Sequence, residues 1–263
     1  LVGYTLVPGW WMLVVLGVLT GLGAGAIDAG LNTFVAAHFG ERLMHWLHAS
    51  WGIGITLGPL IMALGLDRYQ SWRWGYLLVG TAQILLGAYF AATASRWQIR
   101  PAPDGSSKPL HATHPAACYS ETLAEPRVWF SLSLFLVYTG IEATLGVWAY
   151  TLLTESRGII PKVAGFWTGG YWATFTIGRI LAGLFTNRVG ERRLLRASLA
   201  GAVASAAILA WNPTPGVGLA AVVLLGFAIA PVFPALVSGT RDRVGERHTA
   251  NTIGMQMAVA GLG

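Results

Sequence analysis

Long stretches without charged side chains constrain the fold of this chain more than any other feature of its sequence. Residues 1–27 carry no charge, and neither do residues 43–66 or 74–95. A helix needs about 20 apolar residues to cross the hydrocarbon core of a bilayer, and each of these runs reaches that length. The pattern predicts three membrane-spanning helices in the first third of the sequence.

The rest of the sequence continues this pattern with a few interruptions. Residues 128–153 are apolar except for Glu142, and residues 163–187 are apolar except for Arg179. The uncharged run 197–240 is too long for one span, and the prolines at Pro213 and Pro215 divide it because proline stops a helix. A last apolar segment begins near Thr249. We expect an all-α membrane protein with seven full spans and one partial span, and no strands, because the runs do not alternate.

The composition excludes a soluble globular domain. Only 11% of the 263 residues are charged and 54% are hydrophobic, whereas a soluble domain has about 25% charged residues. The single cysteine, Cys118, rules out an internal disulfide and a cysteine metal cluster. The net charge of +6 comes from basic residues in short loops, which does not favour nucleic-acid binding.

The loop charges predict the orientation of the chain. If the spans alternate, twelve basic residues fall on one side and four on the other, with Arg179 inside a span. The positive-inside rule makes the richer side cytoplasmic, so we expect a multi-pass protein of the cell inner membrane. Its cytoplasmic loops would be residues 38–42, 96–127, 188–196 and 239–248.

Residues 96–127 form the longest of these loops. They are rich in Pro, Gly and Ser and lack a periodic pattern, which predicts a flexible linker between three preceding spans and at least five following ones. His111 and His114 lie in this loop without further ligands nearby, so we interpret them as solvated side chains. No metal site is expected.

Asp28 is the first candidate for a functional residue within a span. Gly21, Gly25, Asp28 and Asn32 follow helical spacing and share one stripe. An aspartate at this depth costs roughly 3 kcal/mol on insertion scales, so it must face protein or water. A carboxyl that changes its charge in a cavity is what proton coupling requires. We expect Asp28 to carry the coupling proton and Asn32 to hydrogen-bond either the solute or Asp28, with a polar clamp between helices as the alternative.

Glu142 is the second acid within a span. It is the other candidate for proton coupling, with a structural salt bridge as the alternative, and Arg179 is expected to snorkel or to form a structural gate. Hydroxyl and aromatic side chains suit a solute that offers OH groups and apolar C–H faces. The further candidates for solute binding, each with ordinary packing as its alternative, are Tyr138, Trp148, Trp167, Tyr171 and Gln256.

The loop after the span 163–187 carries a motif. Gly183, Asn187, Arg188, Gly190, Arg192 and Arg193 resemble the cytoplasmic loop signature of the major facilitator superfamily, which runs G-x-x-x-D-R-x-G-R-R. Asn187 stands where the family has Asp, and Glu191 stands where it has a basic residue. The resemblance implies that this segment is a gating loop.

The resemblance also implies a position within a longer protein. If the signature lies after helix eight of the family, residues 1–95 correspond to the end of helix three and to helices four to six. Residues 96–127 become the cytoplasmic linker, and residues 128–263 become helices seven to part of eleven. Since the sequence starts with Leu1 and ends within an apolar run, we expect a chain truncated at both ends.

A narrower resemblance concerns three segments. The runs 21–35, 47–59 and 250–256 are similar to the fourth, fifth and eleventh helices of fucose permease-like sugar–proton symporters. This implies a monomeric, cofactor-free transporter of a small polar solute, first of all a sugar, coupled to protons by alternating access in the lipid bilayer. The alternatives are a drug or metabolite proton antiporter of the same superfamily and a non-transporting membrane sensor. No enzyme motif is present.

Overall fold

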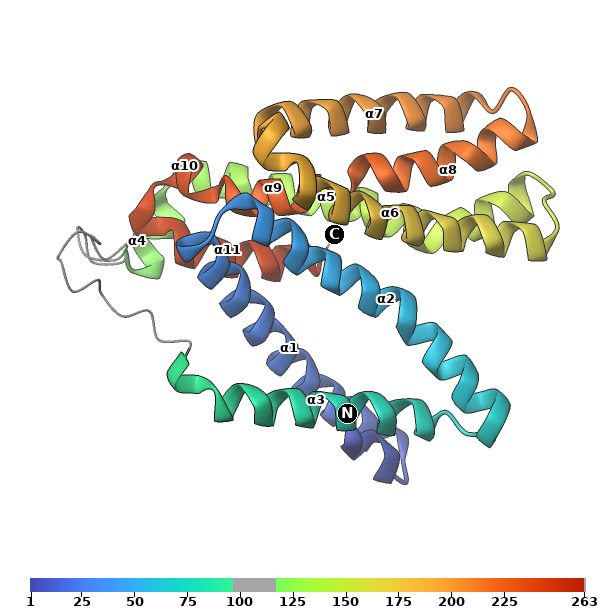
Figure 1. Ribbon diagram of the computed structural model, residues 1–263, viewed down its shortest axis with the longest axis horizontal. Helices are drawn as coiled ribbons and strands as arrows, with labels where there is room; N and C mark the ends of the chain where they lie inside the picture. Colours follow the sequence, from blue (N-terminus) through green and yellow to red (C-terminus); the bar gives the residue numbers. More distant parts are fainter. Residues whose placement is uncertain (97–116, 263) are drawn as a thin grey trace. The chain divides into compact units, whose positions relative to one another are not determined.

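Helices make up every regular element in the part of the chain that the structure describes. The computed structural model describes residues 1–96 and 117–262, and no strand occurs among them (Figure 1). This confirms the prediction of an all-α protein. The contacts divide the chain into two compact units, residues 1–27 with 57–114 and residues 28–56 with 115–263. The first two long helices contribute a part to each unit.

The first unit contains the beginning of the chain and a helical hairpin. Its described elements are a 3-10 helix, Val2–Leu6, the start of α1 (Trp10–His38), the end of α2 (Glu41–Tyr69), α3 (Arg73–Ala92) and a short 3-10 turn, Ala94–Arg96. The 3-10 helix lies against α3, where the rings of Tyr4 and Tyr76 are 5.2 Å apart. Gly80 permits this contact, since a Cβ there would come within 2.8 Å of the backbone nitrogen of Val2.

The second unit holds the remaining helices. Besides the end of α1 and the start of α2, it contains α4 (Tyr119–Ala124), α5 (Pro126–Thr151), a π-helical turn (Leu152–Ser156), α6 (Pro161–Val189), α7 (Glu191–Trp211), α8 (Pro215–Ile229), α9 (Val232–Ser238), α10 (Thr240–Val244) and α11 (Glu246–Ala260). Proline occupies the first position of α5, α6 and α8, where its missing N–H costs nothing.

Local sequence signals explain the helix ends in this unit. The turn between α7 and α8 forms at the predicted proline pair, with Asn212 in the left-handed region at φ 45°. The Thr214 hydroxyl then accepts a hydrogen bond from the Val217 amide at 3.4 Å and caps α8. Pro231 separates α8 from α9, because a proline in a helix removes one backbone hydrogen bond.

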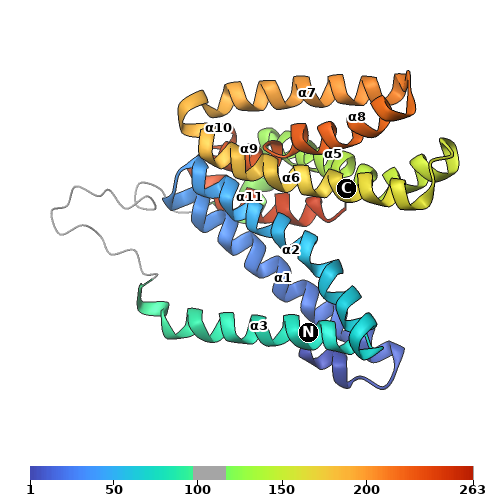
Figure 2. The same cartoon turned by 45° about the vertical axis from the view of Figure 1, so that its right-hand side comes forward.

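Helices α6, α7 and α8 form the most closely packed part of the second unit. Figure 2 shows α7 and α8 running side by side with α6 beneath α8. Gly178 of α6 lies against α8, where an added Cβ would come 2.9 Å from the carbonyl oxygen of Phe227. The surrounding core is apolar and includes the fully buried side chains of Phe135, Phe175 and Val222. Such close approach through small residues is typical of helices in membranes.

Six described helices are long and apolar enough to span a bilayer. Their ranges cover α1, α2, α3, α7, α5 with its π-helical turn, and α8 with α9. The sequence predicts seven full spans, and the difference lies in α6. That helix has 29 residues but carries a buried arginine and several Thr and Gly residues, which make it less apolar. Helix α11 is the predicted partial span, with 15 residues.

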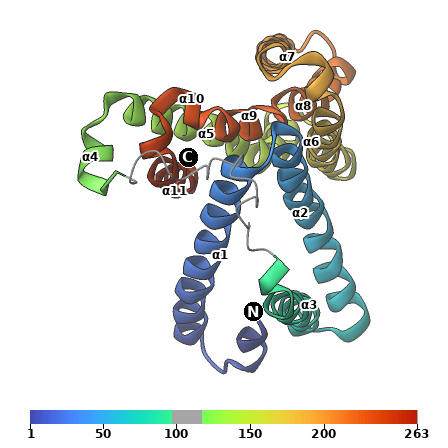
Figure 3. The same cartoon turned by 60° about the vertical axis from the view of Figure 1, so that its left-hand side comes forward.

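The predicted linker 96–127 is helical near its end. Helix α4 lies within it, and the amide of Asn251 in α11 donates to the carbonyl oxygen of Ala117 at 2.8 Å (Figure 3). Glu121 accepts a hydrogen bond from the Cys118 amide at 3.3 Å, which caps the short helix. Residues 97–116, with His111 and His114, lie outside the described part of the chain.

Candidate functional site

A cavity of about 470 Å³ lies within the second unit. It is bounded by α1, α2, α5, α6, α9 and the end of α11. Both acids predicted as proton carriers line it, together with the one basic residue found within a predicted span. Its lining residues are Asp28, His48, Trp51, Ile55, Thr139, Glu142, Ala143, Gly146, Val147, Trp172, Arg179, Phe233, Met257, Ala260 and Gly261.

Asp28 is held by a hydrogen bond from its own helix. The Asn32 amide nitrogen donates to Asp28 Oδ1 and to the Asp28 carbonyl oxygen, each at 2.9 Å. The oxygen of the same amide lies 2.9 Å from His48 Nε2 on α2. Asn32 and His48 are buried, whereas the Asp28 side chain is exposed at the cavity. Asn32 thus connects the acid to the neighbouring helix rather than pointing freely into the cavity.

Arg179 of α6 is 2% exposed, and its guanidinium contacts several helices. Nη1 donates to the carbonyl oxygen of His48 at 3.2 Å, and Nε donates to that of Ala230 at 3.4 Å. The guanidinium also lies over the ring of Phe175 at 4.0 Å. The expectation of a snorkelling side chain is wrong, because the carbonyl oxygens and aromatic rings around Arg179 replace water as its partners.

Glu142 pairs with this arginine across the cavity wall. Its Oε2 lies 3.7 Å from Nη2 of Arg179, and no hydrogen bond reaches that oxygen in the part of the chain described. The Tyr171 hydroxyl donates to the Glu142 carbonyl oxygen at 3.1 Å and fixes the backbone there. The carboxylate therefore has a long ion pair, and its Oε2 is buried with an unused capacity to accept a hydrogen bond.

Aromatic side chains form the apolar wall of the cavity. Trp51 of α2 and Trp172 of α6 meet edge to face with ring centroids 6.3 Å apart. Phe233 of α9 lies 4.8 Å from the His48 ring. Gly146 of α5 leaves room for the Trp172 ring, which an added Cβ would overlap. The cavity therefore joins acidic groups to flat apolar surfaces.

None of the six predicted solute-binding residues is among the residues that line this cavity. Asn32 is buried between Asp28 and His48, and the other five lie elsewhere. Tyr138 donates to the carbonyl oxygen of Ile229 at 3.0 Å, and Tyr171 is fully buried against α5. Trp167 packs on a small cluster with Leu153 and Leu219, and Trp148 is 61% exposed. Gln256 is fully buried, with Nε2 donating to Ser131 at 2.8 Å and to Thr240 at 3.0 Å.

The residues of the predicted gating loop occupy the junction of α6 and α7. Gly183 is buried beside Trp46 of α2, and Gly190 has φ 84° between the two helices. Asn187, Arg188, Arg192 and Arg193 are exposed. One helical turn before Gly190, the buried Thr186 hydroxyl donates to Glu41 Oε2 of α2 at 3.3 Å. Gly183 and Thr186 thus both contact α2 in this region.

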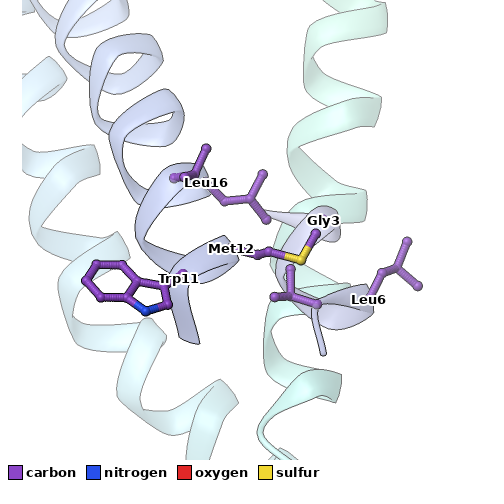
Figure 4. A pocket seen from close by; sticks show the side chains of 7 residues that line it. Gly3, Leu6, Trp11, Met12 and Leu16 are labelled. Atoms are coloured by element: carbon purple, nitrogen blue, oxygen red, sulfur yellow. The ribbon is translucent and has the colours of Figure 1, made fainter. Parts of the chain in front are cut away.

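Two other cavities are mainly apolar. One, in the first unit, has about 440 Å³ and is surrounded by Leu6, Trp11, Met12, Leu16 and their neighbours, none of which is charged (Figure 4). The other, of about 830 Å³, lies between α5, α7 and α8, with Arg157 as its one charged residue. Neither combines acids with hydroxyl groups, so the cavity at Asp28 and Glu142 is the better candidate for a polar solute.

His48, Trp51, Trp172 and Phe233 are among the cavity residues that the sequence did not identify as binding residues. On α6 the sequence predicted Trp167 and Tyr171 as binding residues, and these lie on another face of the helix than Trp172. Aromatic residues have the same spacing on a packed face as on a face that lines a cavity, so spacing alone does not distinguish the two. Arg179 gives the missing signal. It stands seven residues after Trp172, and positions seven apart share a helix face. No group of three metal-ligating side chains occurs among the described residues.

Comparisons with known proteins give a family and several distant relatives. The family model of the Major Facilitator Superfamily matches residues 1–263. The "Glucose/mannose transporter GlcP" of Bacillus subtilis is 23% identical over 88% of this chain and 58% of its own length. "Bypass of stop codon protein 6" of Saccharomyces cerevisiae is 24% identical over 66% of the chain and 39% of its own length.

A third relative is "Major facilitator superfamily domain-containing protein 4A" of Xenopus tropicalis, 26% identical over 54% of the chain and 30% of its own length. The chain thus spans less than two thirds of each of these proteins. No solved structure matches it.

Proposed function

This chain belongs to the major facilitator superfamily, and from that membership we propose that it forms part of a proton-coupled secondary transporter for a small, neutral, polar solute. Sugars are the first class to test. The observation that carries the proposal is the cavity in which Asp28, Glu142 and Arg179 meet the aromatic wall of Trp51 and Trp172. Membership of a transporter superfamily also supports the expectation that the chain catalyses no reaction.

The state of Arg179 favours a neutral solute. Its Nε and Nη1 donate to carbonyl oxygens and its Nη2 faces Glu142, so little of the guanidinium is left to bind an anionic group. Two carboxyls and one guanidinium also leave the cavity without excess positive charge. Thr139 adds a hydroxyl, and the tryptophan rings offer faces for the C–H groups of a sugar. The likeness to a glucose/mannose transporter supports the same class.

Asp28 is the proposed proton carrier. It is exposed at the cavity, so a proton can reach it, and its only side-chain hydrogen bond in the described structure comes from Asn32. Glu142 is the second titratable group of the mechanism. Burial in a low dielectric disfavours the charged form of a carboxyl, which lets solute and proton binding influence each other. Alternating access would expose the site to each side in turn.

The proposed topology follows the sequence prediction. Helices α1 to α3 would be helices four to six of the N-terminal half, and α5 to α11 would be helices seven to part of eleven, with the linker 96–127 between them on the cytoplasmic side. We place the chain closest to fucose permease-like symporters and propose that the protein acts as a monomer. Residues 183–193 would form the cytoplasmic gating loop.

A second candidate is proton antiport of an amphipathic organic cation. The excess of acids over bases in the cavity, together with Trp51, Trp172 and Met257, favours such a solute. The sign of the proton flux separates the two functions. In symport the solute and the proton enter together, whereas in antiport entry of one drives exit of the other.

The test uses the full-length protein that contains this chain, reconstituted in liposomes. Adding a panel of neutral hexoses outside should alkalinise the external medium if the protein is a symporter, whereas proton release on adding organic cations supports antiport. Asp28→Asn should abolish proton-driven accumulation but retain exchange without a proton gradient. Asp67→Asn, at an exposed acid outside the cavity, is the matched control. Unchanged accumulation in Asp28→Asn would contradict the proposal.

A further inference from the structure

The orientation of the Asn32 amide is fixed by a group that cannot donate. Its nitrogen lies 2.9 Å from the Asp28 carbonyl oxygen, which accepts hydrogen bonds in every protonation state of Asp28. The amide oxygen must therefore point the other way, toward His48 Nε2 at 2.9 Å. This orientation holds whether or not the Asp28 carboxyl carries a proton.

The tautomer of His48 follows from this orientation. An amide oxygen only accepts, so His48 Nε2 must carry the hydrogen and donate it. The ring is buried next to Arg179, whose guanidinium donates to the His48 carbonyl oxygen and would repel a positive imidazolium. The neutral form with hydrogen on Nε2 is thus the one that fits, and a proton relay through this ring would have to break the bond to Asn32.

The backbone of His48 contacts Arg179, which is the ion-pair partner of Glu142. The His48 carbonyl oxygen accepts a hydrogen bond from Arg179 Nη1 at 3.2 Å, and Nη2 of that arginine lies 3.7 Å from Glu142 Oε2. His48 therefore touches the Asp28 side through its ring and the Glu142 side through its carbonyl group. The charged and titratable groups around it are Asp28 on α1, His45 on α2, Glu142 on α5 and Arg179 on α6.

We propose that His48 is a positioning residue which, as the neutral Nε2–H tautomer, holds Asn32 and Asp28 in register with the Arg179–Glu142 pair. It does not itself carry the transported proton. The inference rests on the proposed transport function for its role, whereas the tautomer stands on the hydrogen bonds alone.

The first experiment observes the tautomer without any transport. Protein labelled with ¹⁵N-histidine is measured by solid-state NMR in lipid, and the His48 signals are assigned by their loss in His48→Gln. We expect a neutral ring with hydrogen on Nε2 across the pH range of transport, in wild type and in Asp28→Asn alike. A ring with hydrogen on Nδ1, or one that becomes charged in this range, would overturn the proposal.

The second experiment compares two amide substitutions. Glutamine can bring its amide nitrogen to the place of Nε2, whereas asparagine reaches only the place of Nδ1. His48→Asn leaves the Asn32 oxygen without its donor, and we expect proton-driven accumulation to fall about fivefold or more. The Asn32 nitrogen still donates to the Asp28 carbonyl oxygen, but without its anchor on α2 the amide donates less firmly to the Asp28 carboxylate. We therefore expect the pH midpoint of transport to move upward.

His48→Gln should restore most of the accumulation and the wild-type pH midpoint. Equal losses in the two variants, with unchanged pH midpoints, would reduce His48 to a packing residue and overturn the proposal. If the wild-type protein accumulates no solute with protons, the transport function fails, while the NMR result still decides the tautomer.

Discussion

Arg179 illustrates how a buried charge is accommodated by this protein. Its side chain satisfies two carbonyl oxygens, contacts Phe175 and pairs with Glu142, all with 2% exposure. Removing one partner of a buried pair leaves the other charge without compensation, and this usually costs more than the pair contributes. The energetic role of Arg179 can therefore be separated from that of Glu142 by a double-mutant cycle.

For Arg179→Gln we expect the free energy of unfolding to fall by about 3 kcal/mol, because Glu142 loses its ion-pair partner and two carbonyl oxygens lose their donor. Glu142→Gln should cost less, since its oxygen lies at 3.7 Å from the guanidinium. The double variant should be less destabilised than the sum of the single variants. Unfolding in mixed micelles, followed by circular dichroism, measures these changes. Strict additivity would show that the two side chains do not interact.

Trp172 and Trp148 form a matched pair of tryptophans for testing the cavity. Trp172 lines it, whereas Trp148 on α5 is 61% exposed. We expect Trp172→Leu to raise the KM for the transported solute about fivefold, since an aromatic face contributes about 1 kcal/mol to such contacts. Trp148→Leu should leave the KM unchanged. The reverse order, measured by uptake in liposomes, would move the solute site away from this cavity.

The sequence identified the acids of the candidate site but not its aromatic wall. Asp28, Asn32 and Glu142 could be predicted because a charge or amide within an apolar run is rare and must have a partner. Tryptophans are frequent in this chain, and helical spacing alone does not tell which face meets a cavity. Gln256 was predicted to bind solute because an amide within an apolar run is rare. Its partners, however, are Ser131 and Thr240 on other helices.

Helix α6 approaches α8 closely at Gly178. An added Cβ would lie 2.9 Å from the Phe227 carbonyl oxygen, and backbone cannot move aside as a side chain can. Gly178→Ala should therefore lower the free energy of unfolding by about 1–3 kcal/mol. Gly169→Ala, on the same helix but without an atom within 4 Å, should be neutral or stabilising by up to about 1 kcal/mol. A chemical unfolding series in micelles tests both, and equal effects would contradict this packing.

Helix positions were predicted well where apolar runs end at charges or prolines. The run 43–66 became α2, Glu41–Tyr69, and the run 74–95 became α3, Arg73–Ala92. Asn212 and the prolines after it separate α7 from α8 as expected. The short helix α4 escaped prediction because it is held by contacts with α11, such as the hydrogen bond from Asn251 to the Thr122 hydroxyl, which no local pattern reveals.

The orientation of the whole chain in the membrane is the prediction that links its loops to the proposed transport cycle. Twelve basic residues on one side against four on the other favour a cytoplasmic location for the linker and for residues 188–196 and 239–248. Cys118 lies at the end of that linker, is exposed and is the single cysteine of this chain. It therefore offers a direct measurement of sidedness for this linker.

A membrane-impermeant maleimide should label Cys118 in inside-out vesicles and not in right-side-out vesicles. The hydrogen bond with Ser120, at 3.0 Å, holds the pKa of the Cys118 thiol below its usual value, so more thiolate is present near neutral pH and labelling is fast. Ser120→Ala should slow it at the same pH, because the pKa rises.

The opposite side is reported by Ser156→Cys in a Cys118→Ser background, since Ser156 follows α5 at its other end. That variant should be labelled only in right-side-out vesicles. Labelling of both positions from one side would mean that α5 does not cross the membrane, because one span between two positions must place them on opposite faces. The charge bias would then arise from loops that do not alternate, and the proposed numbering of the helices would fail with it.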